Sequence, residues 1–124
     1  MRVLVCGGRD FRNWSALVAA LDKIDTERGI THVIHGEAPG ADYLSDVWGV
    51  ARCKELLRFP ASWQTYGRAA GPIRNAQMLK DGKPDLVVAF KGGDGTANMI
   101  RQAREAGVDV IEVSAPSEPI GASE

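Results

Sequence analysis

The sequence has only two cysteines, Cys6 and Cys53, and they do not form a CxxC pair. This argues against a disulfide framework and against a cysteine-based zinc site. Unpaired cysteines fit a reducing compartment, so we expect a cytoplasmic protein. Cys6 ends a predicted strand and could border a site there, although a buried free cysteine usually packs as a small apolar side chain.

Long apolar runs are also missing, and none approaches the roughly 20 residues that a membrane-spanning helix needs. We therefore expect neither a signal peptide nor a membrane span. No sign of charge dominates, because 15 Lys and Arg residues face 16 Asp and Glu residues, for a net charge of -1. Nucleic-acid binding depends on clustered basic residues, so nucleic acid is not the expected partner and any anion site must be local.

The composition present is that of an ordinary globular domain. Hydrophobic residues make up 44% and charged residues 25% of 124 residues, which is enough for one packed core. We expect a single domain over residues 1–113. The stretch 114–124 is rich in Pro, Ser and Gly and is predicted to be a flexible tail.

Short β-branched runs alternate with amphipathic helical patterns along the chain. Strands are predicted at 2–7, 32–35, 55–59, 85–90 and 108–113, and helices at about 13–27, 42–53, 72–80 and 96–106. This alternation predicts a Rossmann-like α/β fold, an open parallel sheet with helices on both faces. The first and fourth strands are almost unbroken apolar runs, whereas Arg58, Asp109 and Glu112 interrupt the third and fifth. The predicted strand order is therefore 3-2-1-4-5.

Glycine-rich loops follow the two strands between which the chain reverses direction in this order. Residues 6–10 (CGGRD) leave the first strand, and residues 91–96 (KGGDGT) leave the fourth and open a helix. Ligands of open α/β sheets bind at such a switch point, and amides at a helix start can bind phosphate. Neither loop has the GxGxxG or P-loop pattern, so no dinucleotide cofactor and no ATPase is predicted. Tight turns that bind nothing are the alternative interpretation.

Charged side chains of both signs fall at the same predicted edge. The basic set that could balance a phosphate is Arg9, Arg12, Arg68, Arg74 and Lys91. The acidic set that could accept hydrogen bonds from ribose hydroxyls is Asp10, Glu37, Asp42 and Asp94. We expect Asp94 to cap the helix that follows it, while Asp42 could either cap a helix or contact the ligand.

Histidines and aromatic residues offer weaker indications. His32 and His35 lie three apart in a strand and face opposite sides, so no metal site is predicted, and a structural role is favoured for His35 over ligand contact. The connection 60–71 exceeds the usual two to six residues of such a fold. Its Trp63 and Tyr66 could form a stacking wall for a base or seal a subunit contact.

Four ordered motifs resemble the YspA-like branch of the SLOG superfamily, the Rossmann-like group named for the SMF/DprA and Lonely Guy (LOG) proteins. They are residues 6–11 (CGGRDF), 35–42 (HGEAPGAD), 70–79 (AGPIRNAQML) and 88–99 (VAFKGGDGTANM). The resemblance implies a domain that binds nucleotide-derived ligands, in a superfamily of nucleoside-monophosphate hydrolases and non-catalytic sensors. It also implies a homo-oligomer, a dimer whose interface Trp48 or Trp63 could supply.

Of the two sequence motifs of the LOG hydrolases, one is only partly present in this chain. Those enzymes resembled here carry PGGxGTxxE, with the Glu near the ribose, and an Arg followed four residues later by Met. Arg74 and Met78 match the second element, but Lys91 and Met99 stand where the Pro and Glu would be. Methionine cannot transfer a proton or stabilise a ribosyl cation, so LOG-type hydrolysis would need a displaced carboxylate.

We therefore predict a sensor-like domain that binds a nucleotide or an ADP-ribose-like molecule, without a metal or a resident cofactor. The predicted ligand-binding residues all lie in the four motifs: Gly7, Gly8, Arg9, Gly36, Glu37, Asp42, Arg74, Asn75, Gly92, Gly93, Gly95 and Thr96. The first alternative is a nucleotide N-glycosidase or phosphoribohydrolase, with Arg74, Glu37 and Asp42 as catalytic candidates. The second alternative is a structural or assembly module without a ligand.

Overall fold

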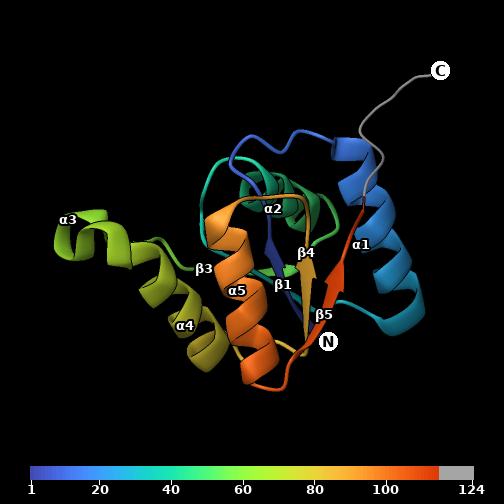
Figure 1. Ribbon diagram of the computed structural model, residues 1–124. Coiled ribbons are helices and arrows are strands. Elements are labelled where there is room, and N and C mark those ends of the chain that lie inside the picture. Colours follow the sequence, from blue (N-terminus) through green and yellow to red (C-terminus); the bar gives the residue numbers. More distant parts are fainter. Residues whose placement is uncertain (115–124) are drawn as a thin grey trace.

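A computed structural model describes residues 1–114 and contains one five-stranded parallel sheet of order β3-β2-β1-β4-β5 (Figure 1). The strands are β1 (Arg2–Cys6), β2 (His32–His35), β3 (Glu55–Arg58), β4 (Leu86–Ala89) and β5 (Asp109–Glu112). The helices are α1 (Trp14–Arg28), α2 (Ala41–Ala51), α3 (Trp63–Tyr66), η1 (Gly67–Ala69), α4 (Ala70–Gly82) and α5 (Asp94–Glu105). The predicted strand order and the Rossmann-like α/β class are confirmed. Apart from Ser114, the predicted tail lies outside the described residues.

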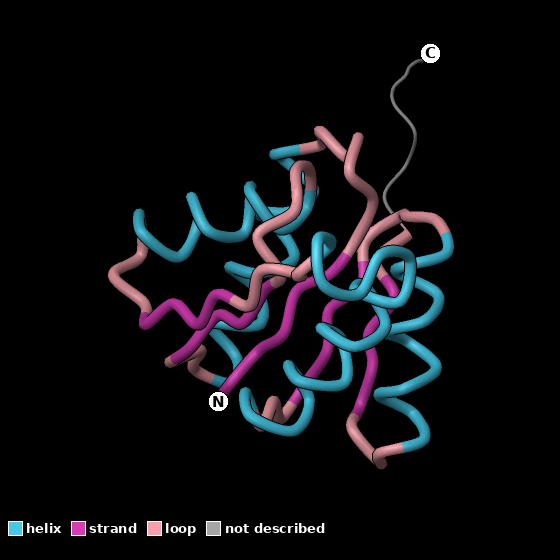
Figure 2. Tube along the Cα trace, turned by 90° about the vertical axis from the view of Figure 1, so that its left-hand side faces the viewer, coloured by secondary structure: helices cyan, strands magenta, loops and turns pink. Residues whose placement is uncertain are grey.

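Helices cover both faces of the sheet (Figure 2). Val3 and Val5 of β1 pack into a core with α1 and α2, whereas Leu4 and Cys6 pack into a second core with α4 and α5. This division follows from the alternation of side chains along a strand. The central strands β1 and β4 are almost wholly buried and β3 and β5 are largely exposed, as the apolar and charged runs predict.

The boundaries of all four predicted helices differ from the observed ones by one or two residues at each end, and α5 begins at Asp94 rather than at residue 96. α4 begins at Ala70 rather than at Pro72. Pro72 is tolerated inside the first turn, because the N–H that a proline lacks would have no partner within the helix there. α2 ends at Ala51 rather than at Cys53, since Cys53 takes a left-handed φ of 58° that cannot continue a helix. The connection predicted as a loop over 60–71 contains α3 and η1.

Trp48 of α2 is wholly buried. Its indole Nε1 donates to Asp22 Oδ1 at 2.9 Å, and the guanidinium of Arg52 lies over its ring, 5.8 Å from the centroid. The expectation that Trp48 supplies a subunit interface is therefore wrong, because the ring is already covered by this chain. The dimer itself stays a prediction. In residues 1–114, no helix is both long and apolar enough to cross a membrane.

Candidate functional site

The loops that follow β1 and β4 touch each other at the carboxyl edge of the sheet. The amide of Gly8 donates to the carbonyl of Lys91 at 2.8 Å, which joins the two glycine-rich segments. The loop before α2 joins them, because Ala41 N donates to Gly8 O at 3.2 Å. The amide of Gly8 is thus used by the fold and is not available to a ligand.

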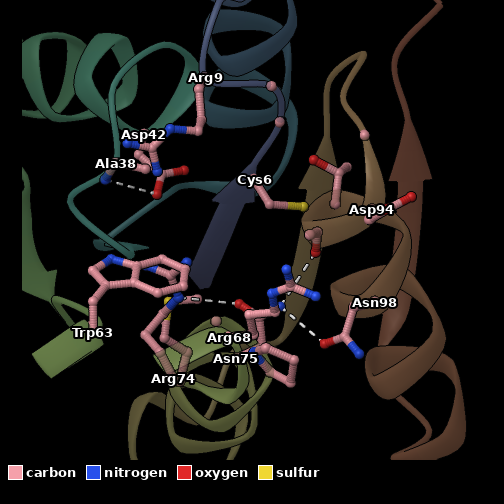
Figure 3. A pocket seen from close by; sticks show the side chains of 18 of the residues that line it. Cys6, Arg9, Ala38, Asp42, Trp63, Arg68, Arg74, Asn75, Asp94 and Asn98 are labelled. Carbon is pink, nitrogen blue, oxygen red and sulfur yellow. Dashed lines mark hydrogen bonds between the residues drawn. The ribbon is translucent and has the colours of Figure 1, made fainter. Parts of the chain in front are cut away.

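A cavity of about 630 Å³ opens beside these loops (Figure 3). Its volume falls in the usual range for small-molecule sites. Nine predicted ligand-binding residues line it: Gly7, Gly8, Arg9, Asp42, Arg74, Asn75, Gly93, Gly95 and Thr96. Five further lining residues, Cys6, Asp10, Trp63, Arg68 and Asp94, were considered from the sequence but left out of the predicted ligand-binding set. The remaining five were not predicted: Ala38, Gly71, Pro72, Met78 and Asn98. Most of these lie inside or next to the four motifs, which is the signal that could have included them.

Three predicted residues lie outside the cavity wall. Gly36 O accepts from Arg74 Nη1 at 2.7 Å, and a Cβ on Gly36 would overlap that guanidinium. Glu37 has a left-handed φ of 57°, and its amide is held by the ring of His35. Gly92 packs against the Thr96 side chain and lines a second hollow of about 480 Å³, which shares Gly93 and Thr96 with the cavity.

The amino end of α5 faces the cavity with unpaired amides. Gly93 occupies the N-cap position and Asp94 is the first helical residue, so the expectation that Asp94 caps this helix is wrong. The first amides of a helix have no partner within it. Among residues 1–114, no loop carbonyl or side chain accepts from the amides of Gly93, Gly95 or Thr96. These N–H groups and the helix dipole favour an anion.

Arg74 is the best-anchored cation of the cavity. Its Nε donates to Asn75 Oδ1 at 3.2 Å, in addition to the bond from Nη1 to Gly36 O. Burial lowers the pKa of this guanidinium; the Asp42 carboxylate opposes the shift and the charge of Arg9 adds to it. Two cations therefore repel each other at one cavity, a repulsion that a bound anion would relieve.

Only three of the five predicted basic residues line the cavity. Arg9, Arg68 and Arg74 line the cavity, whereas Arg12 and Lys91 do not, and Lys91 borders the second hollow.

A chain of amides connects the arginine to the start of α5. Asn75 Nδ2 donates to Gly95 O at 3.2 Å and to Asn98 Oδ1 at 3.1 Å. Asn98 Oδ1 also accepts from Gln102 at 2.7 Å. Asn75 is buried and its amide is fully engaged, so it fixes α4 against α5 and orients Arg74.

Asp42 holds the loop between β2 and α2. Its Oδ2 atom accepts from Gly36 N at 3.0 Å and from Ala38 N at 3.2 Å. The N-cap of α2 is Gly40, so the capping alternative for Asp42 is wrong. The carboxyl is almost fully buried, and burial raises its pKa, although the amides of Ala38 and Gly36 and the charge of Arg74 act in the opposite direction.

His35 is structural, as favoured from the sequence. It is 2% exposed, its Nδ1 accepts from Glu37 N at 3.0 Å, and its Nε2 lies 2.7 Å from Asp46 Oδ2. Because Nδ1 is an acceptor, the neutral ring carries its proton on Nε2 and donates it to Asp46. Asp46 also accepts from Arg58 Nε at 2.6 Å, which ties β2, α2 and β3 together.

Asp10, Asp42 and Asp94 line the cavity, but the thiol of Cys6 and the side chain at the position of the LOG glutamate are poorly suited to hydrolysis. Cys6 borders the cavity, but burial raises the pKa of its thiol to about 12, so the thiol stays protonated. Met99, at the position of the LOG glutamate, is wholly buried in the core between the sheet, α4 and α5. In residues 1–114 no group of three or more His, Cys, Asp or Glu side chains is arranged to hold a metal ion.

Comparison with known proteins agrees with this architecture. A profile of the family described as "YspA, cpYpsA-related SLOG family" matches residues 1–66. The chain is also 36% identical over 123 residues to the "Gene 61 protein" of Mycobacterium phage D29, with 89% of this chain and 94% of that protein covered. The profile match includes the first two predicted motifs, and the phage relative extends the similarity across almost the whole domain.

Proposed function

Since the chain belongs to the YspA, cpYpsA-related SLOG family, whose membership suggests nucleotide-derived ligands, we propose that its cavity binds a nucleotide or an ADP-ribose-like molecule. The observation that carries the proposal is that several anion-binding groups meet at one cavity. The cavity of about 630 Å³ is lined by the first amides of α5, by the anchored Arg74 and by Arg9, and neither those amides nor Arg9 has a partner within residues 1–114. That combination suits a phosphate group on a small organic ligand.

The phosphate and the ribose of such a ligand would each contact specific residues of the cavity wall. The phosphate would lie against Gly93, Gly95 and Thr96, with Arg74 and Arg9 offsetting its charge. A ribose hydroxyl would donate to Asp42, whose Oδ2 serves both loop amides and leaves Oδ1 for the ligand. Gly36, Glu37 and Gly92 would act from behind the wall, by shaping the loops that carry these contacts.

Binding without hydrolysis is the function we favour. A ribosyl transfer needs a carboxylate beside the sugar, yet Met99 is buried and Glu37 lies outside the cavity wall. Asp10, Asp42 and Asp94 line the cavity, and of these Asp42 already accepts two backbone hydrogen bonds that hold the loop. A sensor that returns its ligand unchanged is consistent with these roles.

A thermal-shift screen with nucleoside monophosphates, NAD and ADP-ribose tests the proposal. A ligand at one hundred times its Kd should stabilise the protein by about 2.7 kcal/mol. The Gly95→Val variant should lose that stabilisation, because a Cβ at Gly95 meets no protein atom within 4 Å and the added side chain would extend into open space at the cavity wall. The matched control is Ala97→Val on the same helix, because Ala97 lines the second hollow and not the cavity.

The same incubations separate the alternatives. Free base released from a nucleoside monophosphate, and lost in Asp42→Ala, would establish a hydrolase instead of a sensor. No stabilisation by any compound at millimolar concentration would contradict ligand binding and favour a structural or assembly module.

A further inference from the structure

One wall of the cavity belongs to a segment that the body of the protein barely supports. Residues 62–69, which we call the arm, comprise Ser62, α3 and η1, and none of them is buried. α3 packs mainly against η1 and α4 rather than against the sheet. Figure 1 shows α3 standing away from the sheet at the end of α4.

The arm exposes more aromatic surface than its packing explains. α3 has only four residues, too few to form a stable helix without tertiary support. Trp63 is 51% exposed and Tyr66 is 50% exposed, so both rings face solvent on a segment that has no core of its own. Trp and Tyr are enriched at binding surfaces, because each joins a large apolar ring to a polar atom.

Only one of the two rings belongs to the cavity. Trp63 lines it and Tyr66 does not. The Trp63 ring lies over the start of α4, where its Cη2 atom is 3.6 Å from the position that a Cβ on Gly71 would take. Figure 3 shows the indole on the same side of the cavity as Arg74. A half-exposed aromatic face thus borders the space that receives the phosphate.

The arm also brings an unpaired cation to the same wall. Arg68 lines the cavity and makes no ion pair or side-chain hydrogen bond with any described residue, whereas Arg52, Arg58 and Arg104 are all paired with carboxylates. Gly67 precedes it with φ 56° and ψ -131°, a conformation that glycine adopts far more easily than other residues. The turn at Gly67 therefore sets the direction from which Arg68 reaches the cavity wall.

We propose that the arm reads the base of the ligand, with Trp63 as the specificity-determining residue that stacks on it. This inference rests on the proposed function, since the phosphate end must be held at α5. An aromatic face and a guanidinium on one segment match the two chemistries of a nucleotide, a flat base and an anion. The site therefore selects base-bearing nucleotides over sugar phosphates that lack a base.

Calorimetric titration of the full chain with AMP, ADP-ribose and ribose 5-phosphate tests the assignment. Trp63→Ala should weaken AMP and ADP-ribose by about 5- to 150-fold, the usual effect of losing one base-stacking ring, and leave ribose 5-phosphate within about twofold. Trp63→Phe should retain most of the affinity for AMP. Tyr66→Ala is the matched control, because it removes an equally exposed ring from the same helix outside the cavity.

The outcomes are distinguishable. Equal weakening of AMP and ribose 5-phosphate by Trp63→Ala, or no weakening of either, overturns the role of Trp63 and leaves the phosphate site intact. A Trp63→Ala protein that sediments as a smaller species, with unchanged affinity for AMP, assigns the ring to a subunit contact instead. A wild-type protein that binds none of the three compounds overturns both this inference and the proposed function.

Discussion

Gly40 lies so close to Gly8 that a Cβ on Gly40 would overlap the carbonyl oxygen of Gly8. This contact packs the loop before α2 against the loop after β1, two segments that carry separate motifs. Gly40 also has a φ of 82°, which side chains rarely adopt. The position therefore requires glycine for two independent reasons.

Replacing Gly40 with alanine should destabilise the protein by about 3 kcal/mol or more, through the combined cost of backbone strain and overlap. Gly29→Ala separates the two costs, because Gly29 has a φ of 73° but no atom within 4 Å of its Cβ position. Backbone strain alone should cost about 1–2 kcal/mol there. Urea unfolding of both variants measures the difference, and equal losses would contradict the close packing of the two loops.

Asp42 should give the protein a measurable pH dependence of stability. Its folded pKa is raised by burial, so the folded protein holds this proton more tightly than the unfolded chain does. Its contribution is fully present below the unfolded value of 3.8 and is lost as the pH rises through the folded pKa. The free energy of unfolding of the wild type minus that of Asp42→Asn should therefore increase as the pH falls from neutrality toward 3.8.

The asparagine and alanine variants test the hydrogen bonds of Asp42 separately from its charge. Asparagine keeps an acceptor for the amides of Gly36 and Ala38, whereas alanine leaves both without a partner. Asp42→Ala should cost about 2–3 kcal/mol at pH 7, and Asp42→Asn should cost clearly less. Similar losses in the two variants would show that the carboxylate charge, not the loop hydrogen bonds, is what the fold needs.

Arg9 should contribute to ligand affinity through its charge. It lines the cavity, makes no ion pair with any described residue and shifts the pKa of Arg74. Arg9→Ala should weaken AMP binding by about fivefold, with a smaller effect at high salt. Arg12→Ala removes another exposed arginine, one that lies outside the cavity, and should leave the affinity unchanged. Equal effects of the two variants would reduce the role of Arg9 to general surface charge.

Restoring the glutamate of the LOG hydrolases should not create a hydrolase. Met99 is wholly buried among apolar side chains, so Met99→Glu places a carboxyl in the core. The variant should lose at least about 3 kcal/mol of stability and release no base from AMP. Met99→Leu keeps an apolar side chain of similar volume and should cost less than about 1.5 kcal/mol. A stable Met99→Glu protein that hydrolyses AMP would contradict this prediction and would show that the cavity already holds the ribose in a position suited to cleavage.

The strand order was predictable from the sequence, because a strand buried on both faces is an unbroken apolar run and an exposed edge strand carries charged residues. Val87 and Val88 lie in an unbroken apolar run and are wholly buried, while Asp109 and Glu112 mark an exposed edge strand. The meeting of the two glycine loops follows from that order, since parallel strands end at one edge of the sheet.

The roles of side chains at the same edge were less predictable, because a shift of one or two residues in where a helix begins changes which side chain caps it. Asp94 is a good capping residue by type, but Gly93 occupies the N-cap position. Asp42 stands near a helix start, yet its partners are amides of the preceding loop. The arm was expected as a loop because short helices such as α3 have almost no periodicity to detect.

Amide chemical shifts during a titration with AMP test the central claim most directly, because they report on each N–H group of the proposed phosphate site. The account predicts that the signals of Gly93, Gly95 and Thr96 move most, and that Gly95→Val abolishes the response. The claim is contradicted if those signals stay in place at millimolar AMP, or if the largest shifts fall around the second hollow at Ile100 and Val113.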